Sequence, residues 1–100
     1  MKNKTVVIFG DKFKIKYVPS VTFPGKEDGY FYRGLTTFDD RVIQIATLDA
    51  KGNPLDEKDM KYTLTHELIH AILGSGMYHE ENTNEPLVEL LAKCVVQLID

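Results

Sequence analysis

Two histidines and a glutamate in the second half of the chain have the types and the spacing of a metal-dependent hydrolase site. His66, Glu67 and His70 form the motif HExxH. On a helix, residues four apart lie one turn apart on the same face, so both imidazoles can reach one ion. Glu67 lies about 100° around the helix from His66, outside a ligand position but close enough to accept a proton from water. The motif therefore predicts a zinc site with Glu67 as general base.

The residues around the motif argue against a helix face that is simply solvated. Such a face would have polar neighbours, whereas apolar side chains surround this one: Leu64, Leu68, Ile69, Ala71, Ile72 and Leu73. Two histidines in an apolar helix need a polar partner. We therefore expect a metal ion to be that partner.

The histidine pair leaves the ligand set incomplete, because a catalytic zinc usually takes three protein ligands and a water molecule. Leu73 and Gly76 stand where a metzincin arrangement would need glycine and histidine. Glu85 and Glu89, four residues apart on the next expected helix, are better candidates. One carboxylate would bind the metal and the other would support a histidine. His79 remains an alternative ligand, and a solvated acidic face is the other interpretation of the two glutamates.

The run from HELIH to the acidic helix resembles the gluzincins, the thermolysin-like zinc peptidases. In that pattern HExxH is followed by Asn-Glu and then by an acid four residues after the Glu. Here Asn84, Glu85 and Glu89 occupy those places. The resemblance implies that Glu85 is the third metal ligand and that Glu89 is the acid that supports a histidine.

Nearly the whole chain also resembles the small zinc metallopeptidase-like proteins of phages and prophages. The similarity lies in the short β-region, the THELIHA helix (Thr65–Ala71) and the Val/Leu-rich end of the last helix (Val95–Ile99). It implies a minimal zincin-like domain. The 14 residues between His70 and Glu85 are fewer than in thermolysin. We also expect no C-terminal domain that would supply a second substrate-binding wall.

The first half of the chain reads as strands, which we expect over most of residues 4–48. Thr5–Phe9 and the alternating segment Phe13–Tyr17 predict a hairpin. Tyr30–Phe38 and Arg41–Leu48 predict a second strand pair, and the Pro- and Gly-rich segment before them predicts a loop over 19–29.

The second half reads as helices over about 56–73 and 84–98, with Asp56 as an N-cap and a polar loop between them. Gly74 and Gly76 are expected to end the first helix. Its core-facing stripe is predicted to be Met60, Leu64, Leu68, Ala71 and Ile72. The buried face of the last helix is predicted to be Leu87, Leu91, Cys94, Val95 and Leu98. The order of strands and helices predicts an α+β fold, a small antiparallel or mixed sheet followed by an active-site helix and a closing helix.

Length, charge and composition limit the remaining possibilities. One hundred residues fit a single domain over 1–100, and the net charge of −3 gives no reason to expect nucleic acid as a partner. Lys12, Lys14 and Lys16 alternate with apolar residues, as on the solvated face of a strand. The single cysteine, Cys94, excludes an internal disulfide. No stretch has the length of a signal or membrane segment, so we expect a cytoplasmic protein without a membrane partner.

These features predict a zinc-dependent peptidase that acts on a peptide or protein substrate. The substrate would pair as an extra strand with the sheet edge around Arg33–Phe38. Tyr78, His79 and Arg33 are open alternatives for the group that stabilises the oxyanion. The rival hypothesis is a non-catalytic zinc site that is structural or binds a partner, although such a site has no need of Glu67 as a base. The sequence leaves the oligomeric state open.

Overall fold

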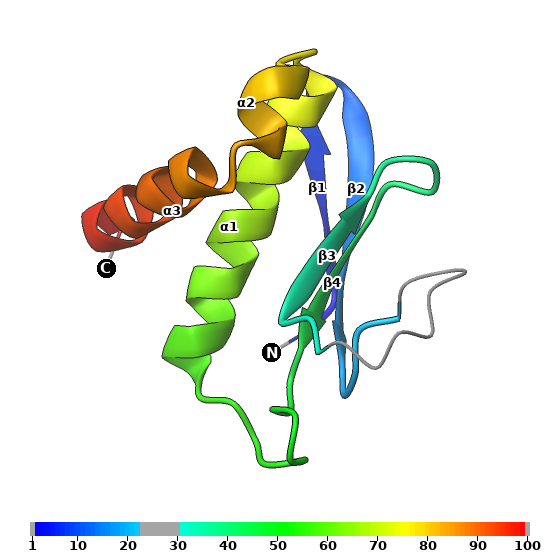
Figure 1. Cartoon of the computed structure of the whole chain (residues 1–100). Coiled ribbons are helices and arrows are strands. Elements are labelled where there is room, and N and C mark those ends of the chain that lie inside the picture. Colours follow the sequence, from blue (N-terminus) through cyan, green and yellow to red (C-terminus); the bar gives the residue numbers. More distant parts are fainter. Residues whose placement is uncertain (1, 23–30, 100) are drawn as a thin grey trace.

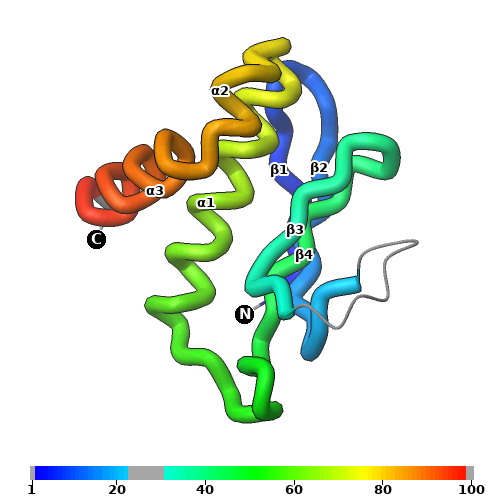
Figure 2. Tube along the Cα trace, in the orientation of Figure 1, coloured from blue at the N-terminus to red at the C-terminus, as the bar shows by residue number. Residues whose placement is uncertain are grey.

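A four-stranded sheet is followed by three helices in the computed structural model, which describes residues 2–22 and 31–99. The α+β prediction is confirmed. Figure 1 shows helix α1 between the sheet and helix α3, and the trace in Figure 2 shows the same arrangement. The strands are β1 (Lys4–Ile8), β2 (Asp11–Val18), β3 (Gly34–Thr37) and β4 (Val42–Ala46). The helices are α1 (Glu57–Ser75), α2 (His79–Thr83) and α3 (Glu85–Ile99).

The predicted hairpin at the N-terminus is confirmed as the antiparallel pair β1–β2. The first strand ends one residue earlier than predicted, at Ile8, and Phe9 and Gly10 after it both have positive φ angles, 50° and 83°. Two consecutive positive φ values are typical of the tight turns whose twist matches that of the flanking strands. Phe9 therefore belongs to the turn and not to the strand.

The sheet is mixed, in the order β1-β2-β4-β3. The predicted second strand pair is confirmed as the antiparallel pair β3–β4, and β4 also runs parallel to β2, which the sequence did not reveal. Strands β3 and β4 are shorter than predicted, whereas β2 is longer. Strand β3 begins only at Gly34, and most of the predicted loop 19–29 and Tyr30 lie outside the described residues. This order makes β3 an edge strand, and it lies against α1.

Helix α1 packs its apolar side on the sheet. Asp56 caps it as predicted, accepting a hydrogen bond from the Asp59 backbone at 2.8 Å. Most of the predicted stripe is confirmed, but Ile72 is 45% exposed. The buried core comprises Ile8, Phe13, Ile15, Ile43, Ile45, Met60, Leu64 and Ala71.

Gly74 was expected to end α1, yet the helix continues through Ser75. A Cβ atom at Gly74 would lie 2.3 Å from the Phe38 ring. Gly74 therefore allows α1 to pack closely against the segment that follows β3. The C-cap of α1 is Gly76.

Two predictions about the last third of the chain were wrong. The segment read as a polar loop contains the short helix α2. Among the α3 residues whose burial is described, Val88 and Ala92 are fully buried and Leu87 is half-buried. Leu98 is 85% exposed, and Leu91, Cys94 and Val95 are also exposed. The reason is that α3 turns its glutamates toward α1, and Val88 and Ala92 lie on that side.

The predicted solvated face of the second strand is confirmed. Lys12, Lys14 and Lys16 are exposed on β2, while Phe13 and Ile15 between them are buried.

No helix within the described residues combines the length and the apolar character needed to cross a bilayer. The cytoplasmic location stays a prediction.

Candidate metal centre

His66 and His70 lie one turn apart on α1, on a face that the sheet does not cover. Their ring centroids are 5.0 Å apart, and the ring planes are inclined by 60°. Only 14% and 15% of the two side chains is exposed. The helix thus holds both imidazoles side by side in a largely enclosed place, as the HExxH spacing predicted.

Glu85 completes the group from the first residue of α3. Its Oε2 lies 3.3 Å from Nε2 of His66, and its Oε1 lies 2.9 Å from Nε2 of His70. Asn84 fixes the start of α3, because its side-chain oxygen accepts a hydrogen bond from the Leu87 backbone at 3.1 Å. This cap holds the glutamate at the end of the helix that meets α1.

The three side chains form a group that could hold a metal ion. One ligand atom from each of them lies within 4.8 Å of the other two. Around a tetrahedral zinc with bonds of 2.0–2.2 Å, neighbouring ligand atoms are about 3.4 Å apart. The separations from the Glu85 carboxylate are close to that value, and two imidazoles with one carboxylate are a donor set that zinc accepts. The group therefore fits the ion that the sequence predicted.

Glu89 approaches the other nitrogen of His66. Its Oε1 lies 3.8 Å from Nδ1 of His66, which is too far for a hydrogen bond but close enough for electrostatic attraction. Its Oε2 accepts a hydrogen bond from the Tyr62 hydroxyl at 3.2 Å. Burial, together with the nearby Glu89 carboxylate, raises the pKa of Tyr62.

Asn82 contacts the other side of His70, and sequence reasoning missed it. Its Oδ1 lies 2.8 Å from Nδ1 of His70. Because an amide oxygen can only accept, Nδ1 is the donor of this bond, and Nε2 is the nitrogen that faces Glu85. Asn82 belongs to α2, a helix of five residues that is too short to produce a periodic signal.

Glu67 is buried between α1 and the edge strand β3. Only 7% of it is exposed, and the Thr36 hydroxyl donates a hydrogen bond to its Oε1 at 2.8 Å. Burial raises the pKa of the Glu67 carboxyl above its ordinary value; the Thr36 hydrogen bond and the nearby His70 and His66 act in the opposite direction. Glu67 therefore lies beside the metal group without belonging to it.

The strand β3 comes unusually close to α1 at this point. A Cβ atom on Gly34 would lie 2.7 Å from Cγ2 of Thr63 and 2.8 Å from Cγ of Glu67. Those distances are far below a normal carbon–carbon contact. Glycine at position 34 is what lets the edge strand reach the motif.

Two cavities open on either side of His66 and Glu67. The first, of about 370 Å³, includes the metal group and has Tyr32, Leu35 and Phe38 in its wall. The second, of about 470 Å³, has the charged residues Arg33, Asp59 and Glu89 in its wall, together with Tyr62. Gly34, His66 and Glu67 line both, so the two cavities meet at the centre of the site.

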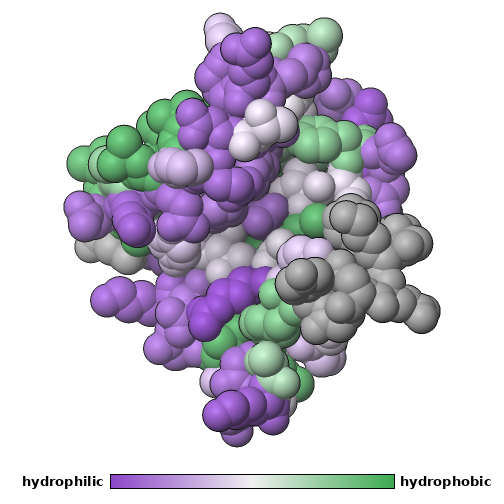
Figure 3. Space-filling view, in the orientation of Figure 1, coloured by the Kyte–Doolittle hydropathy of each residue, from purple (hydrophilic) through white to green (hydrophobic). Residues whose placement is uncertain are grey.

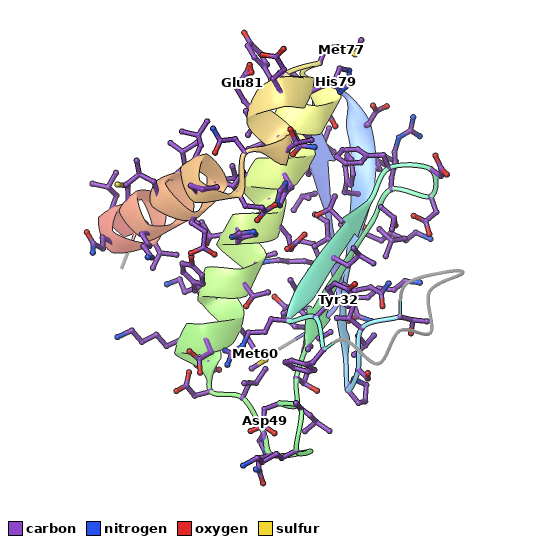
Figure 4. All side chains as sticks on the ribbon, in the orientation of Figure 1. Tyr32, Asp49, Met60, Met77, His79 and Glu81 are labelled. Atoms are coloured by element: carbon purple, nitrogen blue, oxygen red, sulfur yellow. The ribbon has the colours of Figure 1, made fainter. Side chains whose placement is uncertain are left out.

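The remaining residues that the sequence singled out lie in different places. His79 and Tyr78 are exposed, and His79 is not in the metal group that the described residues form. Figure 4 shows His79 beside Met77, where α1 gives way to α2. Arg33 lies in the wall of the second cavity, and its guanidinium is 4.0 Å from the Asp59 carboxylate.

Comparisons of the chain with protein-family models, with curated proteins and with solved structures found no match. The described site therefore has to be interpreted from its own geometry.

Proposed function

We propose that this chain is a zinc-dependent peptidase, a minimal zincin with the gluzincin order of ligands. The observation that carries the proposal is the position of Glu67. A buried carboxyl lies next to a His–His–Glu group and opens into the cavity that this group lines. Burying a carboxyl is costly, and a buried acid in a cleft is typical of a catalytic group.

His66, His70 and Glu85 would hold the ion, with Asn82 fixing the orientation of His70 and Glu89 supporting His66. Zinc in such a site supplies Lewis-acid chemistry, lowering the pKa of water and polarising a carbonyl group. Glu67 accepts the proton of the attacking water and can pass it on to the departing amine. Its raised pKa favours this exchange, because a general base works best when its pKa is near the working pH.

The substrate class that fits the site is an extended peptide. Strand β3 pairs with β4 on one side and with no strand of the described residues on the other, so it can pair with a peptide through its backbone. A peptide bound there would lie over Gly34 and Glu67. The two cavities on either side would then receive its side chains.

The rival, a structural zinc site, has weaker support. A structural zinc closes its fourth position with a protein ligand. His79, the residue available in sequence for that role, lies outside the metal group. The buried Glu67 also has no function in a closed site.

The experiment that tests the proposal compares wild type with Glu67→Gln on a mixed peptide library, with zinc supplied and a chelator as control. The amide keeps the shape of the carboxylate but cannot take the proton. We expect both proteins to bind one zinc and the variant to lose about 10²- to 10⁴-fold in cleavage rate. Equal cleavage by both that resists the chelator would contradict the proposal. Zinc binding by a wild type that cleaves nothing would favour the structural site.

A further inference from the structure

A peptidase of the kind proposed above, on which this inference rests, needs a hydrogen-bond donor for the carbonyl oxygen of its substrate. When the oxygen of water bonds to the carbonyl carbon, the electron pair of the C=O bond moves onto the carbonyl oxygen. Glu67 takes the proton of the water and gives it to the amide nitrogen as the C–N bond breaks and the C=O bond forms again. A donor placed beside the oxyanion stabilises the transition state between these steps.

The three residues that the sequence offered for this role lie elsewhere. Tyr78 and His79 are exposed, and neither is among the described residues that line the cavity of the metal group. Arg33 is in the wall of the other cavity, where its guanidinium faces the Asp59 carboxylate at 4.0 Å. The donor should therefore be a residue that the sequence did not single out.

Asn82 brings a donor to the cavity of the metal group from the short helix α2. Its side chain is half-buried and lies in the cavity wall together with His66, His70 and Glu85. Its Oδ1 is held by Nδ1 of His70 at 2.8 Å, and its amide nitrogen has no hydrogen-bond partner among the described residues. Because the amide is planar and its oxygen is held, its two N–H groups have a fixed direction and can donate to a bound molecule.

The surroundings of Asn82 make such a donor effective. All five residues of α2 are polar, and Figure 3 shows this part of the surface as hydrophilic. Of these five, Asn82 is the one that lines the cavity, whose wall on the strand side includes Leu35 and Phe38. A hydrogen bond to a negative charge is stronger beside apolar groups than in water, because the local dielectric constant is lower.

Tyr32 is the rival donor in the same wall. Figure 4 shows Tyr32 at the beginning of strand β3, away from α2. Asn82 is the stronger candidate, because its contact with His70 places it directly beside the metal group.

We propose that Asn82 is a catalytic residue whose side-chain amide donates a hydrogen bond to the oxyanion of the peptide under attack. The same side chain orients His70 with its oxygen and binds the reacting group with its nitrogen. No proton leaves Asn82 in this role. Removing one donor of this kind usually lowers kcat by about 10²- to 10³-fold.

The variant that separates the two roles is Asn82→Asp. A carboxylate keeps the shape of the side chain and the acceptor for Nδ1 of His70, but it has no N–H group to donate. Asn82→Ala loses both. Thr83→Asp is the matched control for charge, since it adds a carboxylate at the neighbouring exposed residue of α2 and keeps Asn82. Tyr32→Phe tests the rival donor.

The measurement is calorimetric binding of two probes at saturating zinc, which does not depend on turnover. One probe is a phosphinic peptide, whose tetrahedral anion resembles the oxyanion, and the other is a thiol peptide with the same side chains and no such oxygen. We expect wild type, Thr83→Asp and Tyr32→Phe to share one ratio of the two affinities. In Asn82→Asp and Asn82→Ala, the phosphinate affinity should fall about 10²-fold relative to the thiol affinity.

With a peptide that wild type cleaves, Asn82→Asp should lower kcat by about 10²- to 10³-fold and leave KM nearly unchanged. Cleavage by wild type together with an unchanged affinity ratio in Asn82→Asp would overturn this assignment alone and leave Asn82 only the orientation of His70. A loss in Tyr32→Phe without one in Asn82→Asp, or an equal loss in Thr83→Asp, would also overturn it. A zinc-loaded wild type that binds neither probe would overturn the proposed function as well.

Discussion

The side-chain oxygen of Asn82 lies 2.8 Å from Nδ1 of His70, on the far side of the ring from Glu85. This contact links the short helix α2 to the metal group. It fixes which nitrogen of His70 faces Glu85. A partner on the second nitrogen also makes a histidine ligand more basic.

Replacing Asn82 with alanine should weaken zinc binding without removing a ligand. We expect a loss of about 10- to 100-fold in affinity, as is usual when the partner of a ligating histidine is removed. The measurement is a competition titration with a chromophoric chelator. Thr83→Ala is the matched control, because it removes a hydrogen bond within α2, to Glu80 at 2.9 Å, that does not involve His70. Equal affinities of wild type and Asn82→Ala would show that α2 does not orient His70.

Replacing Glu85 and replacing Glu89 should have very different effects on the zinc affinity measured in the same titration. Glu85 lies within 3.3 Å of both histidines, whereas Glu89 is 3.8 Å from His66 and also accepts a hydrogen bond from the Tyr62 hydroxyl. We expect Glu85→Gln to abolish tight binding, because an amide is a poor ligand for zinc. Glu89→Gln should keep one equivalent of zinc at reduced affinity. The opposite order of effects would exchange the roles of the two acids.

The residues of the metal group could be predicted because their signals are local. His66, Glu67 and His70 occupy adjacent turns of one helix, and Glu85 follows a capping asparagine that marks the start of the next. Asn82 and Thr36 could not be predicted, since each contact joins elements distant in sequence. The spacing of hydrophobic residues along the chain indicates helices and strands, but it does not indicate how α2 or β3 packs against α1.

The buried side of α3 shows where periodicity misleads. The leucine stripe is the stronger hydrophobic signal, so burial was predicted there. Glu85 and Glu89 lie on a different side of the helix, and α1 can cover only one side. The carboxylates face the histidines, so Val88 and Ala92 are the residues of α3 that are buried, while most of the leucine stripe is exposed.

Zinc should raise the thermal stability of the chain, because the ligands come from two helices that are brought together only in the folded state. At a free zinc concentration 100 times the Kd, the expected gain is about 2.7 kcal/mol. For a domain of this size that corresponds to an increase in Tm of roughly 10 °C or more. Differential scanning fluorimetry with zinc and with a chelator measures it. His70→Ala should remove the increase, whereas His79→Ala should keep it.

Gly34→Ala should test whether the close approach of β3 to α1 matters for the site. The added methyl group would meet Thr63 and Glu67, and neither can move freely. Thr63 is buried, and its hydroxyl donates to the Asp59 carbonyl at 3.0 Å; Glu67 is held by Thr36. The edge strand therefore has to shift away from α1.

Overpacking of this kind costs about 1–3 kcal/mol, so the free energy of unfolding should fall by that amount in urea titrations. Zinc affinity should stay close to wild type, because the ligands come from α1 and α3. Peptide cleavage should decrease, since both the base and the edge strand are displaced. Thr63→Ser removes the methyl group nearest to the new Cβ and keeps the hydroxyl. Adding it to Gly34→Ala should restore part of the stability. A Gly34→Ala variant as stable and as active as wild type would show that β3 does not hold Glu67 in place.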